Sequence, residues 1–185
     1  LWLGKMKNGS GDPLSLLERL TSIYIEVLQK LSAAGADWVQ LDEPILGLPL
    51  SEEFKKAFSG AYKKLSQAAP SLKLLVAVYF SDLRDNLGTL TDLPISGIHL
   101  DLVRAENQLE SVLNGLPDGM SLSLGLVDGR NIWKTNLSKA LATIKKTVSA
   151  LGSERVIVAP SSSLLHSPVD LDLETRLDQE MKSWL

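Results

Sequence analysis

Residues 39–46, VQLDEPIL, place two acidic residues at the end of an apolar run and follow them with a proline. The run predicts a buried parallel strand over residues 38–42. Because Pro44 has no N–H to donate to a sheet, the strand is expected to end before it. Asp42 and Glu43 then lie at the carboxyl end of the strand. Neighbouring strand residues point to opposite faces, so these two acids are not expected to form a catalytic pair.

The composition is ordinary for a globular domain and excludes several classes of function. Of the 185 residues, 44% are hydrophobic and 22% are charged, with a net charge of -3 and no block of like charges. This balance argues against a nucleic-acid partner, and no apolar run is long enough to cross a membrane. The sequence contains no cysteine, which excludes disulfides and thiolate metal sites. We therefore expect a cytoplasmic protein.

Helical periodicity and strand-like runs alternate along the chain. Helices are expected over residues 13–34, 51–65, 83–90, 106–113 and 137–151. Strands are expected near residues 38–42, 73–79, 97–101, 121–126 and 155–159. Five strands that each follow a helix predict an α/β fold with a parallel sheet.

Polar residues follow every predicted strand, and their placement separates two parallel architectures. They are Asp42 and Glu43, then Tyr79, Ser81 and Asp82, then Asp101 and Arg104, then Asp128, Arg130 and Asn131, then Ser161, Ser162 and Ser163. A (β/α)8 TIM barrel builds its site from several strand ends at once, and no GxGxxG motif follows the first strand to favour an open sheet. A complete barrel needs eight strands, so residues 1–185 are expected to form part of one barrel, without an internal domain boundary.

Five ordered motifs carry a resemblance to a known family. LWLGK, WVQLDEPIL, LDLVRA, LSLGLVDGRNIW and VAPSSSLLHSPVDL occur in this order along the chain. Together they resemble the N-terminal domain of cobalamin-independent methionine synthase. The resemblance implies a two-barrel methyltransferase that moves a methyl group from 5-methyltetrahydropteroyltriglutamate to homocysteine, with zinc bound in its C-terminal barrel. This chain would run from the end of barrel strand three through strand eight of the N-terminal barrel and would pack on the absent C-terminal barrel.

The same resemblance implies roles for individual positions. Asp42 corresponds to an aspartate of the catalytic barrel that binds the amino group of homocysteine. The positions that match the zinc ligands are held by Ala77, Tyr79, Asp101 and Ser162. Only Asp101 among them could bind a metal, and a zinc site needs three or four converging ligands. The chain is therefore expected to carry no cofactor and to act as a scaffold on the side of the folate tail.

Four residues are our candidates for substrate binding: Asp42, Asp101, Asp128 and Arg130. Asp128 and Arg130 form a carboxylate–guanidinium pair in the sequence VDGRN, although Asp-Gly is also a common turn sequence. His99 lies two residues before Asp101, and hence on the same face of its strand, but a buried hydrogen-bonded histidine explains the pattern better than a ligand pair does. We assign no catalytic and no metal-binding residue to this chain.

Two other readings of the sequence stay open. One is a small stand-alone (β/α) enzyme that uses Asp42, His99 and Asp101 as an acid–base or metal set. The other is a non-catalytic interaction module.

Overall fold

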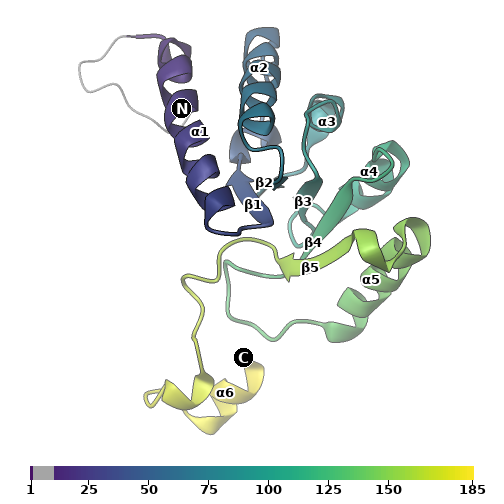
Figure 1. Cartoon of the computed structure of the whole chain (residues 1–185). Helices are drawn as coiled ribbons and strands as arrows, with labels where there is room; N and C mark the ends of the chain where they lie inside the picture. Colours follow the sequence, from purple (N-terminus) through teal and green to yellow (C-terminus); the bar gives the residue numbers. More distant parts are fainter. Residues whose placement is uncertain (2–10) are drawn as a thin grey trace.

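The fold is a five-stranded parallel sheet with the helices between residues 17 and 151 along one side, while the short C-terminal helix lies apart from the sheet (Figure 1). The computed structural model describes Leu1 and residues 11–185. The strands are β1 (Trp38–Asp42), β2 (Lys73–Val78), β3 (Gly97–Asp101), β4 (Ser121–Val127) and β5 (Val156–Pro160). All neighbouring pairs are parallel, and the spatial order is the chain order. The predicted α/β fold with five parallel strands is confirmed, whereas residues 2–5 of the expected strand end LWLGK lie outside the described residues.

The helices follow the predicted pattern. The first, third and fourth begin later than predicted, the second extends further and the fifth has the predicted bounds. They are α1 (Leu17–Ala33), α2 (Glu52–Ala68), α3 (Leu87–Thr91), α4 (Leu109–Gly115), α5 (Leu137–Leu151) and α6 (Gln179–Trp184). Short 3-10 turns precede or join them at η1 (Pro13–Leu16), η2 (Pro44–Gly47), η3 (Arg84–Asn86), η4 (Glu106–Gln108), η5 (Ser153–Arg155) and η6 (Leu171–Leu173). The side chain of Asp12 accepts from the N–H of Leu14 and caps the turn η1 that leads into α1, while that of Ser51 accepts from the N–H of Phe54 and caps α2 at its expected start. The sequence reading did not include α6.

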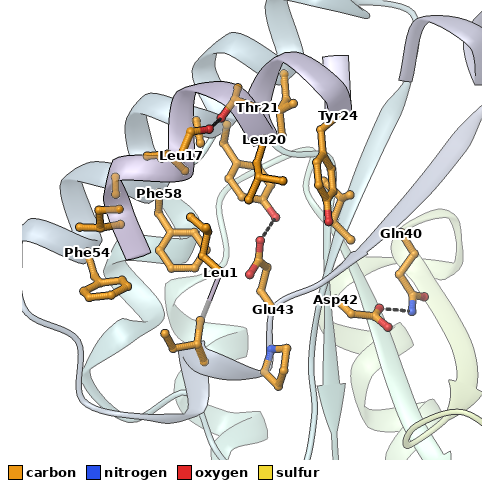
Figure 2. A pocket seen from close by; sticks show the side chains of 18 residues that line it. Leu1, Leu17, Leu20, Thr21, Tyr24, Gln40, Asp42, Glu43, Phe54 and Phe58 are labelled. Atoms are coloured by element: carbon orange, nitrogen blue, oxygen red, sulfur yellow. Dashed lines mark hydrogen bonds between the residues drawn. The ribbon is translucent and has the colours of Figure 1, made fainter. Parts of the chain in front are cut away.

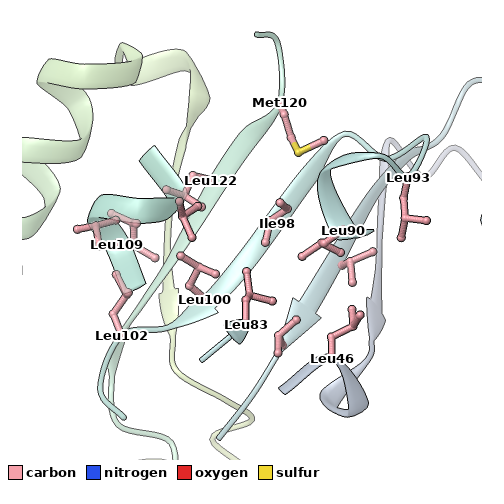
Figure 3. Packing of buried hydrophobic residues seen from close by; sticks show 14 of the residues in the cluster. Leu46, Leu83, Leu90, Leu93, Ile98, Leu100, Leu102, Leu109, Met120 and Leu122 are labelled. Carbon is pink, nitrogen blue, oxygen red and sulfur yellow. The ribbon is translucent and has the colours of Figure 1, made fainter. Parts of the chain in front are cut away.

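The hydrophobic core lies on the side of the sheet that the helices cover. Alternate strand residues point to this helix face, namely Val76, Val78, Ile98, Leu100, Leu122 and Leu124. They pack against buried residues of α3 and α4, including Leu90, Leu109 and Val112 (Figure 3). The intervening residues form what we call the polar face of the sheet, made of Gln40, Asp42, Ala77, Tyr79, His99, Asp101, Ser123 and Gly125.

A glycine on the polar face lets the end of β5 approach β3 across β4. A Cβ atom at Gly125 would lie 2.7 Å from the Cα of Ser161 and 2.6 Å from the carbonyl oxygen of Leu100. The register between β4 and β5 also shifts between Gly125 and Val127, as at a β-bulge. Only glycine fits this contact, and the contact brings Ser161 close to the imidazole of His99.

Removing a core side chain should destabilise the protein far more than removing an exposed one. Leu100 is fully buried in the middle of the sheet. We expect Leu100→Ala to lower the free energy of unfolding by about 2–5 kcal/mol because it removes buried methyl groups and leaves a cavity. Leu165→Ala is the control, since Leu165 is 80% exposed and its loss should change stability by less than about 0.5 kcal/mol. Urea unfolding followed by circular dichroism measures both; equal effects would contradict the described core.

Candidate functional site

The two acids of the DEP sequence point to opposite sides of β1, as predicted (Figure 2). The Asp42 carboxylate lies on the polar face, where its Oδ1 atom accepts from Gln40 Nε2 at 2.8 Å and from the Tyr79 hydroxyl at 3.1 Å. Burial and the neighbouring Asp42 carboxylate raise the pKa of Tyr79 to about 12, so the phenol keeps its proton at neutral pH. Gln40 and Tyr79 therefore hold one oxygen of Asp42, while the side chain itself stays exposed at the strand end.

Glu43 points instead between α1 and α2. There it accepts a hydrogen bond of 3.1 Å from the buried hydroxyl of Tyr62 on α2. Burial raises the pKa of Glu43, and burial together with the Glu43 carboxylate raises the pKa of Tyr62 well above its ordinary value. The pair lines a largely apolar, open pocket of about 690 Å³, together with Leu17, Leu20 and other residues of the two helices and of β1. This arrangement ties the end of β1 to α2.

The carboxylate of Asp101 connects two loops at the carboxyl ends of the strands. Asp101 is fully buried, and its Oδ2 atom accepts from the backbone N–H of Phe80 at 3.1 Å. Its Oδ1 atom accepts from the N–H groups of Val103 and Arg104 at 3.1 and 3.0 Å. The guanidinium of Arg104 lies 3.7 Å from Oδ2. Asp101 is thus a positioning residue that fixes the loops after β2 and β3 relative to each other.

His99 lies on the same face as Asp101 but makes a separate set of contacts. Its Nε2 atom is 3.3 Å from the carbonyl oxygen of Ser161, and its Nδ1 atom is 2.9 Å from the hydroxyl of Ser123. Since a carbonyl only accepts, Nε2 carries the proton, and the neutral ring accepts at Nδ1. Burial lowers the pKa of His99, which favours this neutral form. The ring also meets Tyr79 edge-on, with centroids 5.5 Å apart.

The predicted pair of Asp128 and Arg130 lies in the loop after β4, beside the loop after β2. Asp128 accepts from the backbone N–H of Arg130 at 2.8 Å and from the amide of Asn131 at 2.6 Å, which closes the Asp-Gly turn. Its Oδ1 atom is 3.3 Å from the guanidinium of Arg104. The guanidinium of Arg130 extends instead over the ring of Phe80, 5.5 Å from its centroid. The Arg104 guanidinium lies 5.9 Å from the same centroid.

Some members of this site carried little or no signal in the sequence. Phe80 has a left-handed backbone with a φ of 67°, which is unusual for an aromatic residue. Nothing in the stretch VYFSD indicates this conformation, because the N–H that anchors it bonds to Asp101, more than 20 residues away. Gln40 and Tyr62 were likewise missed as partners of the two acids. The alternating pattern of β1 places Gln40 on the face of Asp42, so this partner could have been found.

The residues at the positions that resemble zinc ligands do not fit a zinc ion. Ala77 has no donor atom, and the hydroxyl of Tyr79 is bonded to Asp42 and Gln40. Asp101 already receives three backbone N–H groups, and Ser162 offers only a neutral hydroxyl. Within the described residues, no group of three or more His, Cys, Asp or Glu side chains is arranged to hold a metal.

The chain is similar in sequence to one known protein family. Residues 1–152 match the family model described as the cobalamin-independent synthase, N-terminal domain. The chain belongs to this family. Its curated relatives include the 5-methyltetrahydropteroyltriglutamate–homocysteine methyltransferases of Nitrobacter winogradskyi, 50% identical, and of Rhodopseudomonas palustris, 51% identical. Both matches cover all 185 residues of this chain but only 24% of the relative, so the chain spans about a quarter of their length.

Solved structures of cobalamin-independent synthases share the fold. One is a Listeria monocytogenes protein provisionally described as a vitamin-B12-independent methionine synthase, with a TM-score of 0.62 over 84% of this chain and 50% of that one. Another is a B12-independent methionine synthase from Shewanella sp. W3-18-1 in complex with selenomethionine, with a TM-score of 0.60 over 96% of this chain and 53% of that one. Both are 15% identical in sequence, so the likeness concerns the fold. In the part of the chain that the structure describes, no helix has the length and apolar character to span a membrane.

Neutralising the carboxylate of Asp101 should loosen both loops that it connects. Asparagine keeps one acceptor oxygen and adds an N–H₂ group that faces backbone N–H donors. We expect Asp101→Asn to destabilise the protein by about 2 kcal/mol because it leaves buried donors without an acceptor. Asp118→Asn is the matched control: Asp118 is fully exposed, with Arg155 at 3.9 Å, and its loss should change stability by less than about 0.5 kcal/mol. Urea unfolding measures the stability of both variants. An unchanged free energy of unfolding in Asp101→Asn would contradict the role of Asp101 in holding the two loops together.

The buried imidazole of His99 should make stability depend on pH. The fold lowers the pKa of His99 below its ordinary 6.5, so the unfolded chain binds this proton more readily. The contribution is fully present above about pH 6.5 and is lost as the pH falls toward the lower pKa of the folded state. We expect the free energy of unfolding, measured with urea between about pH 7.5 and 5.5, to show this loss in the wild type but not in His99→Gln. His166→Gln is the control and should behave like the wild type, because His166 is exposed. Identical pH profiles for all three proteins would refute the assignment.

Proposed function

We propose that this chain is part of a methyltransferase that transfers a methyl group from 5-methyltetrahydropteroyltriglutamate to homocysteine. The observation that carries the proposal is the 50% identity, over all 185 residues, to a curated enzyme named for this reaction. The relative is about four times longer, so the activity is proposed for a larger polypeptide that includes this chain. Within it, the chain would act as the scaffold on the side of the folate tail. A cytoplasmic location is part of the proposal and is supported by the absence of cysteine.

We infer that the five strands form a sector of one (β/α)8 barrel, from the end of strand three through strand eight, with no domain boundary inside residues 1–185. The sequential strand order and the placement of α1 to α5 on a single face support this inference (Figure 1). Exposed apolar residues also lie at both ends of the sector. They are Ile23 and Val27 on α1 and Val158 on β5. Neighbouring βα units of a complete barrel would cover them.

We call the loops at the carboxyl ends of the strands the rim. The rim residues Asp42, Asp101, Asp128 and Arg130 have different proposed roles toward a substrate. Both bonds to Asp42 end on its Oδ1 atom, which leaves Oδ2 as the oxygen for a cationic group such as an amine. Arg130 presents an exposed guanidinium. Asp101 and Asp128 accept backbone N–H groups, so their part is to shape the rim on which Asp42 and Arg130 stand.

We propose that the zinc ion and the second barrel lie in other parts of the larger polypeptide. The positions matched to zinc ligands lack a suitable donor set, so a zinc ion, which would activate the homocysteine thiol, is proposed for another part of the polypeptide. The same larger polypeptide would supply the C-terminal barrel against which this chain packs. The 24% coverage of the relatives leaves room for such a barrel.

A chimeric enzyme tests the proposal. In the Nitrobacter winogradskyi methyltransferase, the matching quarter is replaced by residues 1–185 of this chain. We expect methyl transfer from the folate triglutamate to homocysteine at a rate within about tenfold of the parent enzyme, because the fold and half of the residues are shared. Asp42→Asn in the chimera should reduce activity, measured as kcat/KM for each substrate.

The parent enzyme and a version lacking the segment are the controls. The deletion should be inactive if the segment scaffolds the catalytic part. A chimera that folds cooperatively but transfers no methyl group would overturn the proposed function.

A further inference from the structure

Phe80 occupies an unusual conformation at the carboxyl end of β2. Its φ of 67° is a left-handed backbone that a bulky residue rarely adopts, and its side chain is 50% exposed. The bond from its N–H to the buried carboxylate of Asp101 holds it there. Backbone strain of this kind is concentrated at ligand-binding sites and persists only where the surroundings enforce it. A half-exposed ring in this position needs an explanation other than core packing.

Two arginines from different loops converge on this ring. Arg104, after β3, and Arg130, after β4, have their guanidinium carbons 5.9 and 5.5 Å from the centroid of Phe80. Arg104 is held in place by Asp128 at 3.3 Å and Asp101 at 3.7 Å. Arg130 makes no ion pair within the part of the chain that the structure describes. Both guanidinium groups thus lie within 6 Å of the centroid of one ring, and ion pairs anchor that of Arg104.

The carboxylates near these arginines are already engaged by other donors. Asp101 accepts three backbone N–H groups, and Asp128 accepts the N–H of Arg130 and the amide of Asn131. Each guanidinium has five N–H donors, and in Arg104 only one nitrogen is used by the described ion pairs. A polar cavity of about 460 Å³ opens beside Phe80 and Arg104. Two further carboxylates line it, Asp82 and Glu106, and they are paired with Arg84 and Lys139. Unused donors of Arg104 therefore face this cavity, while Arg130 does not line it and is exposed to solvent.

We propose that Arg104 and Arg130, arranged on the ring of Phe80, bind an oxyanion, the carboxylate or phosphate group of a small molecule. Planar guanidinium groups match the two oxygens of such a group with paired hydrogen bonds. The formal charges of Arg104, Arg130, Asp101 and Asp128 sum to zero, so affinity comes from directed donors rather than from a strong positive field. The expected Kd is about millimolar.

This inference extends the role of Arg130 but does not depend on methyl transfer. The isolated chain binds the anion even if the chimeric enzyme is inactive, and an active chimera does not require this site. The two experiments therefore fail independently.

An NMR titration tests the site. Inorganic phosphate and, separately, succinate are added to the ¹⁵N-labelled chain at constant ionic strength set with chloride. We expect saturable shifts at the amides of Phe80, Arg104, Gly129 and Arg130 with at least one of the two probes. Saturation by phosphate alone identifies a phosphate site, and saturation by succinate identifies a site that accepts carboxylates.

Substitutions separate this site from general screening of charge. Arg130→Gln should weaken binding by about tenfold or more, since it removes a charge-assisted donor, and Arg130→Lys should recover part of the affinity. Arg176→Gln removes another exposed arginine, in the C-terminal segment, and should leave the affinity unchanged. The proposal is overturned by the absence of saturable shifts with either probe, or by equal affinities in Arg130→Gln and Arg176→Gln.

Discussion

Three backbone N–H groups converge on the buried carboxylate of Asp101, and the shape of the rim depends on them. A buried charge is tolerated only where hydrogen bonds replace its hydration, and here the donors come from the loops after β2 and β3. The carboxylate thereby makes two loops that are distant in sequence behave as one unit. The left-handed Phe80 and the placement of Arg104 beside it both follow from this arrangement.

A second constraint on these loops is the close contact between Gly125 of β4 and Ser161 after β5, on the polar face. Gly125 allows Ser161 to lie over β4, and the carbonyl of Ser161 then meets the imidazole of His99. The hydroxyl of Ser161 in turn accepts from the N–H of Gly129, at the turn that positions Arg130. The neutral histidine thus connects β3 with Ser123 of β4 and with the end of β5. The loops at the carboxyl ends of the strands are therefore held both by the His99 and Ser161 contacts on the polar face and by the Asp101 carboxylate.

Much of the fold could be predicted from the sequence because local signals specify it. Apolar runs gave the strands to within a residue or two, Pro44 marked the end of β1, and Asp12, Ser51 and Gly152 marked helix ends. The short helix α6 carries no buried residue, so it lacked the hydrophobic pattern from which the other helices were predicted.

The candidate site was only partly predictable. Asp42 and Glu43 were correctly placed on opposite faces by the period of a strand. The role of Asp101 as an acceptor for two loops, and the backbone of Phe80, arise from contacts between segments far apart in sequence. A glycine inside a predicted strand often marks a bulge or the close approach of another backbone. Gly125 therefore indicated such a contact, which the alternation of polar and apolar residues does not reveal. What the local pattern could not supply was which segment would approach it.

The sequential order of the strands also bears on how the chain acquires its structure. Each of the strands β2 to β5 pairs with the strand that precedes it in the chain, so none of these pairings has to wait for a later segment. Each loop closure spans a single βα unit, which keeps the contact order lower than in a sheet whose strands pair out of sequence, and a lower contact order favours faster folding. During synthesis on the ribosome, each new βα unit could dock on the edge left by the one before it. The sheet would then grow in the direction of translation, with its most recently added strand always the edge that receives the next.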